Sequence, residues 1–134
     1  MTLVDTPSPV VIVVDDDAAL ANALSFAFGI EGFDVRTYGD AESLLAAGDY
    51  PDQGCLVLDY RLPGLDGLSL LGRLRDAHVA LPAILVTTNP RADLRSRAAA
   101  AGTPIVEKPL LTDALLKAVR QAVQMASRAT GRPA

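Results

Sequence analysis

Hydrophobic residues in this chain fall into short continuous runs that alternate with segments where apolar positions recur at helical spacing. The runs at 10–14, 54–60 and 82–88 are rich in Val, Ile and Leu, which predicts parallel strands buried on both faces. Shorter runs at 33–38 and 104–107 predict two further strands. Helical spacing predicts helices over 18–30, 40–48, 63–77 (after an initial turn), 90–102 and 110–125.

The residues at the ends of the helical segments support these assignments. Asp17, Asp40 and Thr112 stand where side-chain oxygens can cap the first backbone N–H groups of a helix. Pro90 and Gly102 bracket another segment in the usual order, with proline at the start and glycine at the end. The local signals therefore agree with the hydrophobic pattern.

The alternation of strands and helices predicts the arrangement of the whole chain. Short connections between alternating strands and helices imply an α/β fold with a parallel sheet and helices on both faces. The expected fold is a doubly wound, five-stranded sheet in the order 2-1-3-4-5. We expect one domain over 9–126, a disordered N-terminus over 1–8, and a flexible tail or linker start over 127–134.

Composition narrows the class of protein. The 134 residues carry a net charge of −4, with one cysteine and one histidine. A single cysteine and a single histidine exclude an internal disulfide, a cysteine-rich zinc site and a multi-histidine metal mechanism. The acidic balance argues against direct nucleic-acid binding by these residues. No apolar run is long enough to span a bilayer and the N-terminus does not resemble a signal peptide, so we expect a cytoplasmic protein.

Polar residues follow four of the predicted strands at their carboxyl ends, where open parallel sheets bind ligands. Asp15 and Asp16 follow the first strand, Asp59 ends the third, Thr87 ends the fourth and Lys108 follows the fifth. Clustered carboxylates are stable when a hard divalent cation neutralises them, and Mg²⁺ prefers such oxygen ligands. Aspartate is also an acceptor in covalent phosphoryl chemistry, and Thr and Lys can bind phosphoryl oxygens.

Four motifs in this order carry a resemblance to a known family. They are "VVDDD" (13–17), "LVLDYRLPGLDGL" (56–68), "AILVTT" (83–88) and "VEKPL" (106–110). With these motifs the chain resembles the receiver domain of two-component response regulators, of the FixJ type, which has a CheY-like fold. The resemblance covers roughly residues 9–126.

The resemblance implies a role for each matching residue. Asp59 would be the phosphoacceptor, and Mg²⁺ or Mn²⁺ would be held by Asp15, Asp16, Asp59 and the backbone carbonyl of Arg61. The remaining roles would be switch and phosphate binding by Thr87, Thr88 and Lys108, a cis peptide before Pro109, and loop shaping by Pro63 and Gly67. Implied partners are a histidine kinase or phosphotransfer protein, and a second copy of the chain. The dimer would use either helix 90–102, strand 104–107 and helix 110–125, or helices 18–30 and 110–125. The resemblance implies no membrane partner.

The chain departs from the family pattern near the expected site. Ile105 stands three residues before Lys108, where the family usually has the aromatic half of the switch. Thr88 is larger than the usual residue after the switch threonine, which predicts slower access of phosphodonors. Arg61 and Asn89 occupy positions that are expected to tune the lifetime of a phosphoaspartate.

Other functions stay open at this point. A degenerate receiver that binds partners without phosphorylation stays open because of Ile105, although the intact acidic set argues against it. An Mg²⁺-dependent phosphatase of the haloacid-dehalogenase type needs a second Asp two residues after the first. The segment "DYRLP" lacks it, so we expect no conventional enzyme. A flavodoxin-like redox carrier would bind the phosphate of FMN. The carboxylates would repel that phosphate, and no Ser/Thr-rich phosphate loop follows the first strand. Arg91, Arg95 and Arg97 form either a solvated face or a docking surface.

Overall fold

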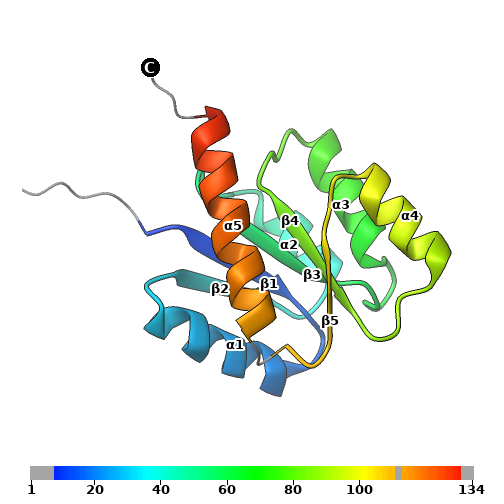
Figure 1. The fold of residues 1–134 in the computed structure, drawn as a ribbon, viewed down its shortest axis with the longest axis horizontal. Coiled ribbons are helices and arrows are strands. Elements are labelled where there is room, and N and C mark those ends of the chain that lie inside the picture. Colours follow the sequence, from blue (N-terminus) through cyan, green and yellow to red (C-terminus); the bar gives the residue numbers. More distant parts are fainter. Residues whose placement is uncertain (1–7, 111–112, 131–134) are drawn as a thin grey trace, which may run out of the picture.

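The computed structural model describes residues 8–110 and 113–130, which form five strands and five helices in strict alternation (Figure 1). The strands are β1 (Val10–Val14), β2 (Asp34–Tyr38), β3 (Gly54–Asp59), β4 (Ala83–Thr87) and β5 (Ile105–Glu107). The helices are α1 (Ala18–Ile30), α2 (Ala41–Ala47), α3 (Gly67–Asp76), α4 (Ala92–Ala100) and α5 (Asp113–Thr130).

All five strands form one sheet in the order β2-β1-β3-β4-β5, and every neighbouring pair is parallel. The predicted fold class and strand order are therefore confirmed. The chain moves outward from β1 to one edge of the sheet and then returns to add β3, β4 and β5 on its other side. The carboxyl ends of β1 and β3 are thus adjacent at the point where the direction of winding reverses, which is where such sheets bind ligands.

Helices cover both faces of the sheet (Figure 1). Side chains alternate between the two faces along each strand, and this divides the core in two. On β3, Leu56 and Leu58 contact the core under α2, α3 and α4, whereas Cys55 and Val57 contact the core under α1 and α5. All six residues of β3 are buried. This double burial explains why the strand reads as a continuous apolar run.

The helix ends agree with the local sequence signals, with one clear difference. The side chains of Asp17 and Asp40 cap α1 and α2 as predicted, whereas Thr112 lies outside the described residues. Helix α5 continues to Thr130, beyond the end predicted at residue 125. The prediction was wrong because it relied on apolar periodicity, which reports packing against the sheet. No glycine or proline interrupts the helix before Gly131.

Two glycines are required by close backbone approach. A Cβ at Gly54 would lie 2.0 Å from the carbonyl oxygen of Val10 on the neighbouring strand. A Cβ at Gly67 would lie 2.5 Å from the carbonyl oxygen of Asp59. The second contact packs the start of α3 directly against the end of β3, and the loop-shaping role of Gly67 stays a prediction.

Among the described residues, no helix combines the length and apolar character needed to cross a bilayer.

Candidate functional site

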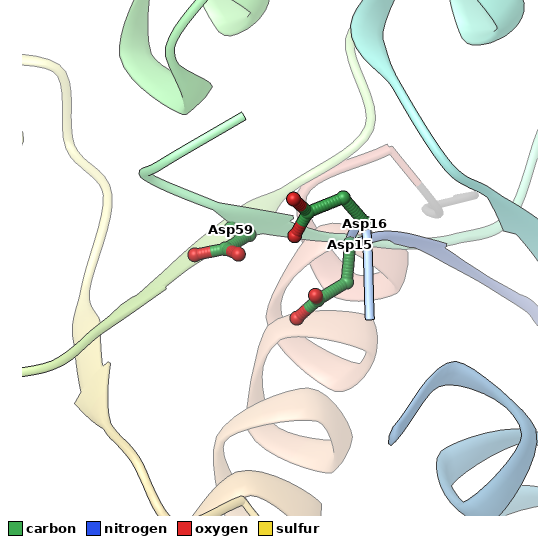
Figure 2. A group of neighbouring side chains, drawn as sticks. All are labelled: Asp15, Asp16 and Asp59. Carbon is green, nitrogen blue, oxygen red and sulfur yellow. The ribbon is translucent and has the colours of Figure 1, made fainter. Parts of the chain in front are cut away.

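Three carboxylates converge at the carboxyl ends of β1 and β3 (Figure 2). Asp15 and Asp16 follow β1 directly, and Asp59 is the last residue of β3. One carboxylate oxygen from each residue lies within 4.8 Å of the others. Asp15 and Asp59 are buried, with 2 % and 4 % of their surface exposed, while Asp16 is exposed. The sequence correctly predicted that these three residues would meet.

Backbone N–H groups hold the two buried carboxylates in place. The N–H of Asp17 donates to Oδ1 of Asp15 at 2.9 Å, and the N–H of Arg61 donates to Oδ1 of Asp59 at 3.3 Å. Oδ2 of Asp15 is buried and accepts no hydrogen bond within the described part of the chain. A buried carboxylate oxygen without a donor is unfavourable unless a positive charge lies near it. Oδ2 of Asp15 is therefore a suitable ligand for a cation.

Lys108 supplies the nearest positive charge. Its Nζ lies 3.4 Å from Oδ2 of Asp59 and 3.5 Å from Oδ2 of Asp15. The lysine is positioned by its backbone N–H, which donates to the carbonyl of Thr87 at 2.9 Å. The peptide bond between Lys108 and Pro109 is cis, as predicted. The backbone hydrogen bond to β4 thus holds Lys108 at the sheet edge where its ammonium group contacts Asp59 and Asp15.

The cluster carries more negative than positive charge, and this shifts the pKa values of its members. Burial, and then the charge of Asp15, raise the pKa of Asp59, and these effects outweigh Lys108 and the Arg61 N–H, which lower it. Burial lowers the pKa of Lys108, but Asp59 and Asp15 together raise it above its usual value. One ammonium group therefore does not compensate three neighbouring carboxylates. A bound divalent cation would supply the missing positive charge.

The predicted switch residues lie around the cluster in different environments. Thr87 is buried at the end of β4, where it pairs with Glu107. Thr88 is exposed. Ile105 is half-buried in register with Leu85 and packs against the core under α2, α3 and α4.

The loop after Asp59 leads from β3 to the start of α3. Arg61 and Pro63 are exposed, and the carbonyl of Pro63 accepts the N–H of Leu65 at 2.9 Å. Asp66 then caps α3 by accepting the N–H of Ser69 at 2.8 Å. The role of the Arg61 backbone carbonyl as a metal ligand stays a prediction.

The donor atoms present fit a hard divalent cation. Carboxylate oxygens are the ligands that Mg²⁺ and Mn²⁺ prefer, and Mg²⁺ usually retains several waters beside one or two carboxylates. Asp16, being exposed, can contribute its oxygen without burying further charge. Asp15, Asp16 and Asp59 could therefore hold one metal ion at the edge of the sheet.

Two contacts beside the site were not predicted from the sequence. Arg97 on α4 donates through Nη1 to the hydroxyl oxygen of Tyr60 at 3.4 Å, and Arg95 forms an ion pair with Glu107 at 3.2 Å. The arginines had been considered only as a group on one helix. The available signal was strand alternation, which directs Tyr60 to the face opposite Asp59 and toward α4.

Comparison with known proteins agrees with this geometry. Residues 11–120 match the model of the response regulator receiver domain family. Among curated proteins, the chain is 34 % identical over 120 residues to the transcriptional regulatory protein FixJ of Bradyrhizobium diazoefficiens, covering 89 % of this chain and 58 % of that protein. It is 38 % identical to FixJ of Azorhizobium caulinodans, covering 81 % of this chain and 52 % of that protein. The chain thus spans little more than half the length of these relatives.

Solved structures give the same result. Full-length FixJ from B. japonicum is 34 % identical, with a TM-score of 0.81, over 92 % of this chain and 62 % of that one. The structure of FixJ-N is 30 % identical, with a TM-score of 0.78, over 89 % of this chain and 96 % of that one. Because the family model matches residues 11–120, which is most of its length, this chain belongs to the response regulator receiver domain family.

Proposed function

We propose that this chain accepts a phosphoryl group on Asp59 and thereby changes the surface it presents to a partner. The observation that carries the proposal is the environment of Asp59. Its buried carboxylate lies within 4.8 Å of two further carboxylates and 3.4 Å from a lysine ammonium group. The geometry combines a nucleophilic oxygen, a candidate cation site and a fixed positive charge in one place.

The transfer proceeds by displacement at phosphorus. A carboxylate oxygen of Asp59 forms the new O–P bond while the bond from phosphorus to the donor breaks. With a phosphohistidine donor, the electron pair of the P–N bond returns to the imidazole, which takes a proton from solvent. The product is an acyl phosphate on Asp59 and an unmodified histidine.

The residues around Asp59 have separable roles in this reaction. Asp15 and Asp16, together with Asp59, would hold the metal ion, and Mg²⁺ bound there would supply charge neutralisation between the carboxylates and the arriving phosphoryl group. Lys108, already in contact with Asp59, pairs with a phosphoryl oxygen. Thr87, at the end of the adjacent strand, donates a hydrogen bond from its hydroxyl group to a phosphoryl oxygen.

The donor in this proposal is a histidine kinase or a phosphotransfer protein. The FixJ relatives are transcriptional regulators by name. In this proposal, the phosphorylated chain passes its signal to an output of that kind through a surface that contacts another protein. Phosphorylation could expose a surface that binds a second copy of the chain. That surface would be formed either by α4, β5 and α5 or by α1 and α5. Turnover of generic phosphoesters is not expected.

The test is intact-mass measurement after incubation with acetyl phosphate and Mg²⁺. The wild-type chain should gain the mass of one phosphoryl group, and a chelator should prevent the gain. Asp59→Asn should gain nothing. Asp52→Asn is the matched control, because Asp52 is an exposed carboxylate on the loop before β3, at the opposite end of the sheet.

A gain of mass in Asp59→Asn equal to that of the wild type would refute the assignment of the acceptor. If the wild type gains no mass, binding of beryllofluoride with Mg²⁺ separates the remaining alternatives. Binding identifies a receiver that accepts only from its own kinase. Absence of binding identifies a degenerate receiver that acts as a protein-binding module.

A further inference from the structure

The contact between Tyr60 and Arg97 joins the end of β3 to helix α4. Tyr60 follows Asp59 directly, yet the two side chains lie on opposite faces of the sheet, because successive residues of a strand alternate. Leu56 and Leu58, on the Tyr60 side, pack under α2, α3 and α4, and Tyr60 packs against the same core. One peptide bond therefore separates the proposed acceptor from a side chain that reaches α4.

The backbone of Tyr60 is fixed from two directions. Its N–H donates to the carbonyl of Val86 at 2.9 Å, and its carbonyl accepts the N–H of Gly67 at 2.9 Å. Asp59 pairs with Val86 in the sheet, so Tyr60 continues the register opposite Thr87. Strand alternation then directs the side chains of Tyr60 and Thr87 to the same face. Tyr60 thus lies beside the hydroxyl that is proposed to bind the phosphoryl group.

The far end of the Tyr60 ring is held by α4. Nη1 of Arg97 donates to the hydroxyl oxygen at 3.4 Å, a long hydrogen bond between a half-buried ring and an exposed guanidinium group. The hydroxyl of Tyr60, followed by the nearby carboxylates of Asp66 and Asp93, raises the pKa of Arg97. These carboxylates offer alternative partners if the hydroxyl moves away. At 3.4 Å and with an exposed donor, the hydrogen bond to Tyr60 is itself a weak one.

Position 105 cannot make an equivalent contact. Ile105 is half-buried on the same face as Tyr60, one row further from the site, in register with Leu85. Its side chain has no hydroxyl and cannot hydrogen-bond to α4. Among the described residues of β3, β4 and β5 and their carboxyl ends, the aromatic side chain on the α4 face at the site is that of Tyr60.

We propose that Tyr60 transmits the state of the Asp59 site to α4 through its contact with Arg97. This inference rests on the proposed phosphoryl acceptance. When Thr87 moves toward a phosphoryl group, the space beside the Tyr60 ring changes, the hydroxyl leaves Arg97, and α4 is released at that point. Tyr60 is a positioning residue in this scheme and does not contact the reacting atoms.

The test is two-dimensional ¹⁵N–¹H NMR of the full chain with and without beryllofluoride and Mg²⁺. Shift changes at the amides of residues 15–17 and 59–61 report loading of the site, and those of residues 92–101 report the response of α4. The test variants are Tyr60→Phe and Arg97→Gln. Matched controls are Tyr38→Phe, a half-buried tyrosine against the same core, and Arg91→Gln, an exposed arginine beside the same helix.

The expected result is that both test variants load the site as the wild type does but lose more than half of the α4 shift change. The double variant should lose no more than either single variant, because both remove one contact. An α4 response of wild-type size in Tyr60→Phe, with the site loaded, overturns the inference alone. Failure of the wild-type site amides to respond overturns the proposed function as well.

Discussion

Replacing Asp59 with Asn is expected to stabilise the metal-free fold, although it removes the proposed acceptor. The side chain is buried, so its charge is unfavourable in the folded state, and it is repelled by two carboxylates within 4.8 Å. Asn keeps nearly the same shape, and its carbonyl oxygen can still accept the hydrogen bond from the N–H of Arg61. The substitution therefore removes charge with little change in packing.

The magnitude follows from the distances. At an effective dielectric constant between 20 and 80, a repulsion across 4.8 Å contributes about 1 to 3.5 kcal/mol, and the attraction of Lys108 across 3.4 Å contributes about 1 to 5 kcal/mol. Burial of the charge, together with the repulsion from Asp15, outweighs the attraction of Lys108. Asp59→Asn should therefore raise the free energy of unfolding by about 1 kcal/mol, which is roughly the equivalent of one pKa unit. For a domain of this size the melting temperature should rise by about 4 °C.

The assay is urea and thermal unfolding followed by far-ultraviolet circular dichroism at neutral pH with a chelator. Asp52→Asn, an exposed carboxylate, is the control and should leave stability unchanged. Addition of Mg²⁺ should stabilise the wild type by about 1.4 kcal/mol at a concentration tenfold above its dissociation constant. The same addition should stabilise Asp59→Asn less, because a ligand has been removed.

The pH dependence gives an independent check. Because burial and Asp15 raise the pKa of Asp59 in the fold, ionisation of this group lowers stability as pH rises through the folded pKa. Below the ordinary pKa of a carboxyl group, Asp59 is protonated in both folded and unfolded chains. The advantage of Asp59→Asn should therefore be present at neutral pH and disappear in acid. A variant that is less stable than the wild type at neutral pH without metal refutes this account of the cluster.

Three further outcomes are expected. Asp17→Ala removes the side-chain cap of α1 and should lower the free energy of unfolding by about 1 kcal/mol in urea titrations, whereas Asp17→Asn should not. Gly67→Ala places a Cβ 2.5 Å from a backbone oxygen of β3 and should reduce phosphorylation measured by mass; Gly72→Ala, with open space in the same helix, should be tolerated. Burial raises the pKa of Cys55 to about 12, so the thiol should react with Ellman's reagent only after unfolding, and rapid native reaction would contradict its burial.

Much of this fold is legible in the sequence because the signals are local and agree with one another. The strands β1, β3 and β4 are continuous apolar runs, and strand alternation with helices leaves few topologies. The acidic cluster was also predictable, since the topology places the ends of β1 and β3 together and Asp15, Asp16 and Asp59 stand at those ends.

What escaped prediction depends on side chains that are distant in the sequence. The hydrogen bond between Arg97 and Tyr60 depends on the distance of α4 from the sheet, which no local pattern encodes. The position of Lys108 beside Asp59 was predicted, but its second contact, with Asp15, depends on the register of β5 against β4. The end of α5 at Thr130 was missed because a helix can continue after its apolar face has ended.

The close approach at Gly54 has a consequence for how this sequence can vary. A single methyl group there would overlap the carbonyl of Val10, at 2.0 Å, so β1 would have to move away from β3. The same strand ends at the residue before Asp15, and a displaced strand carries its far end with it. A substitution at the edge of the sheet opposite the acidic cluster could thus silence the protein without altering any residue of the site. In a population of variants, Gly54 should be as intolerant of change as the proposed acceptor, Asp59.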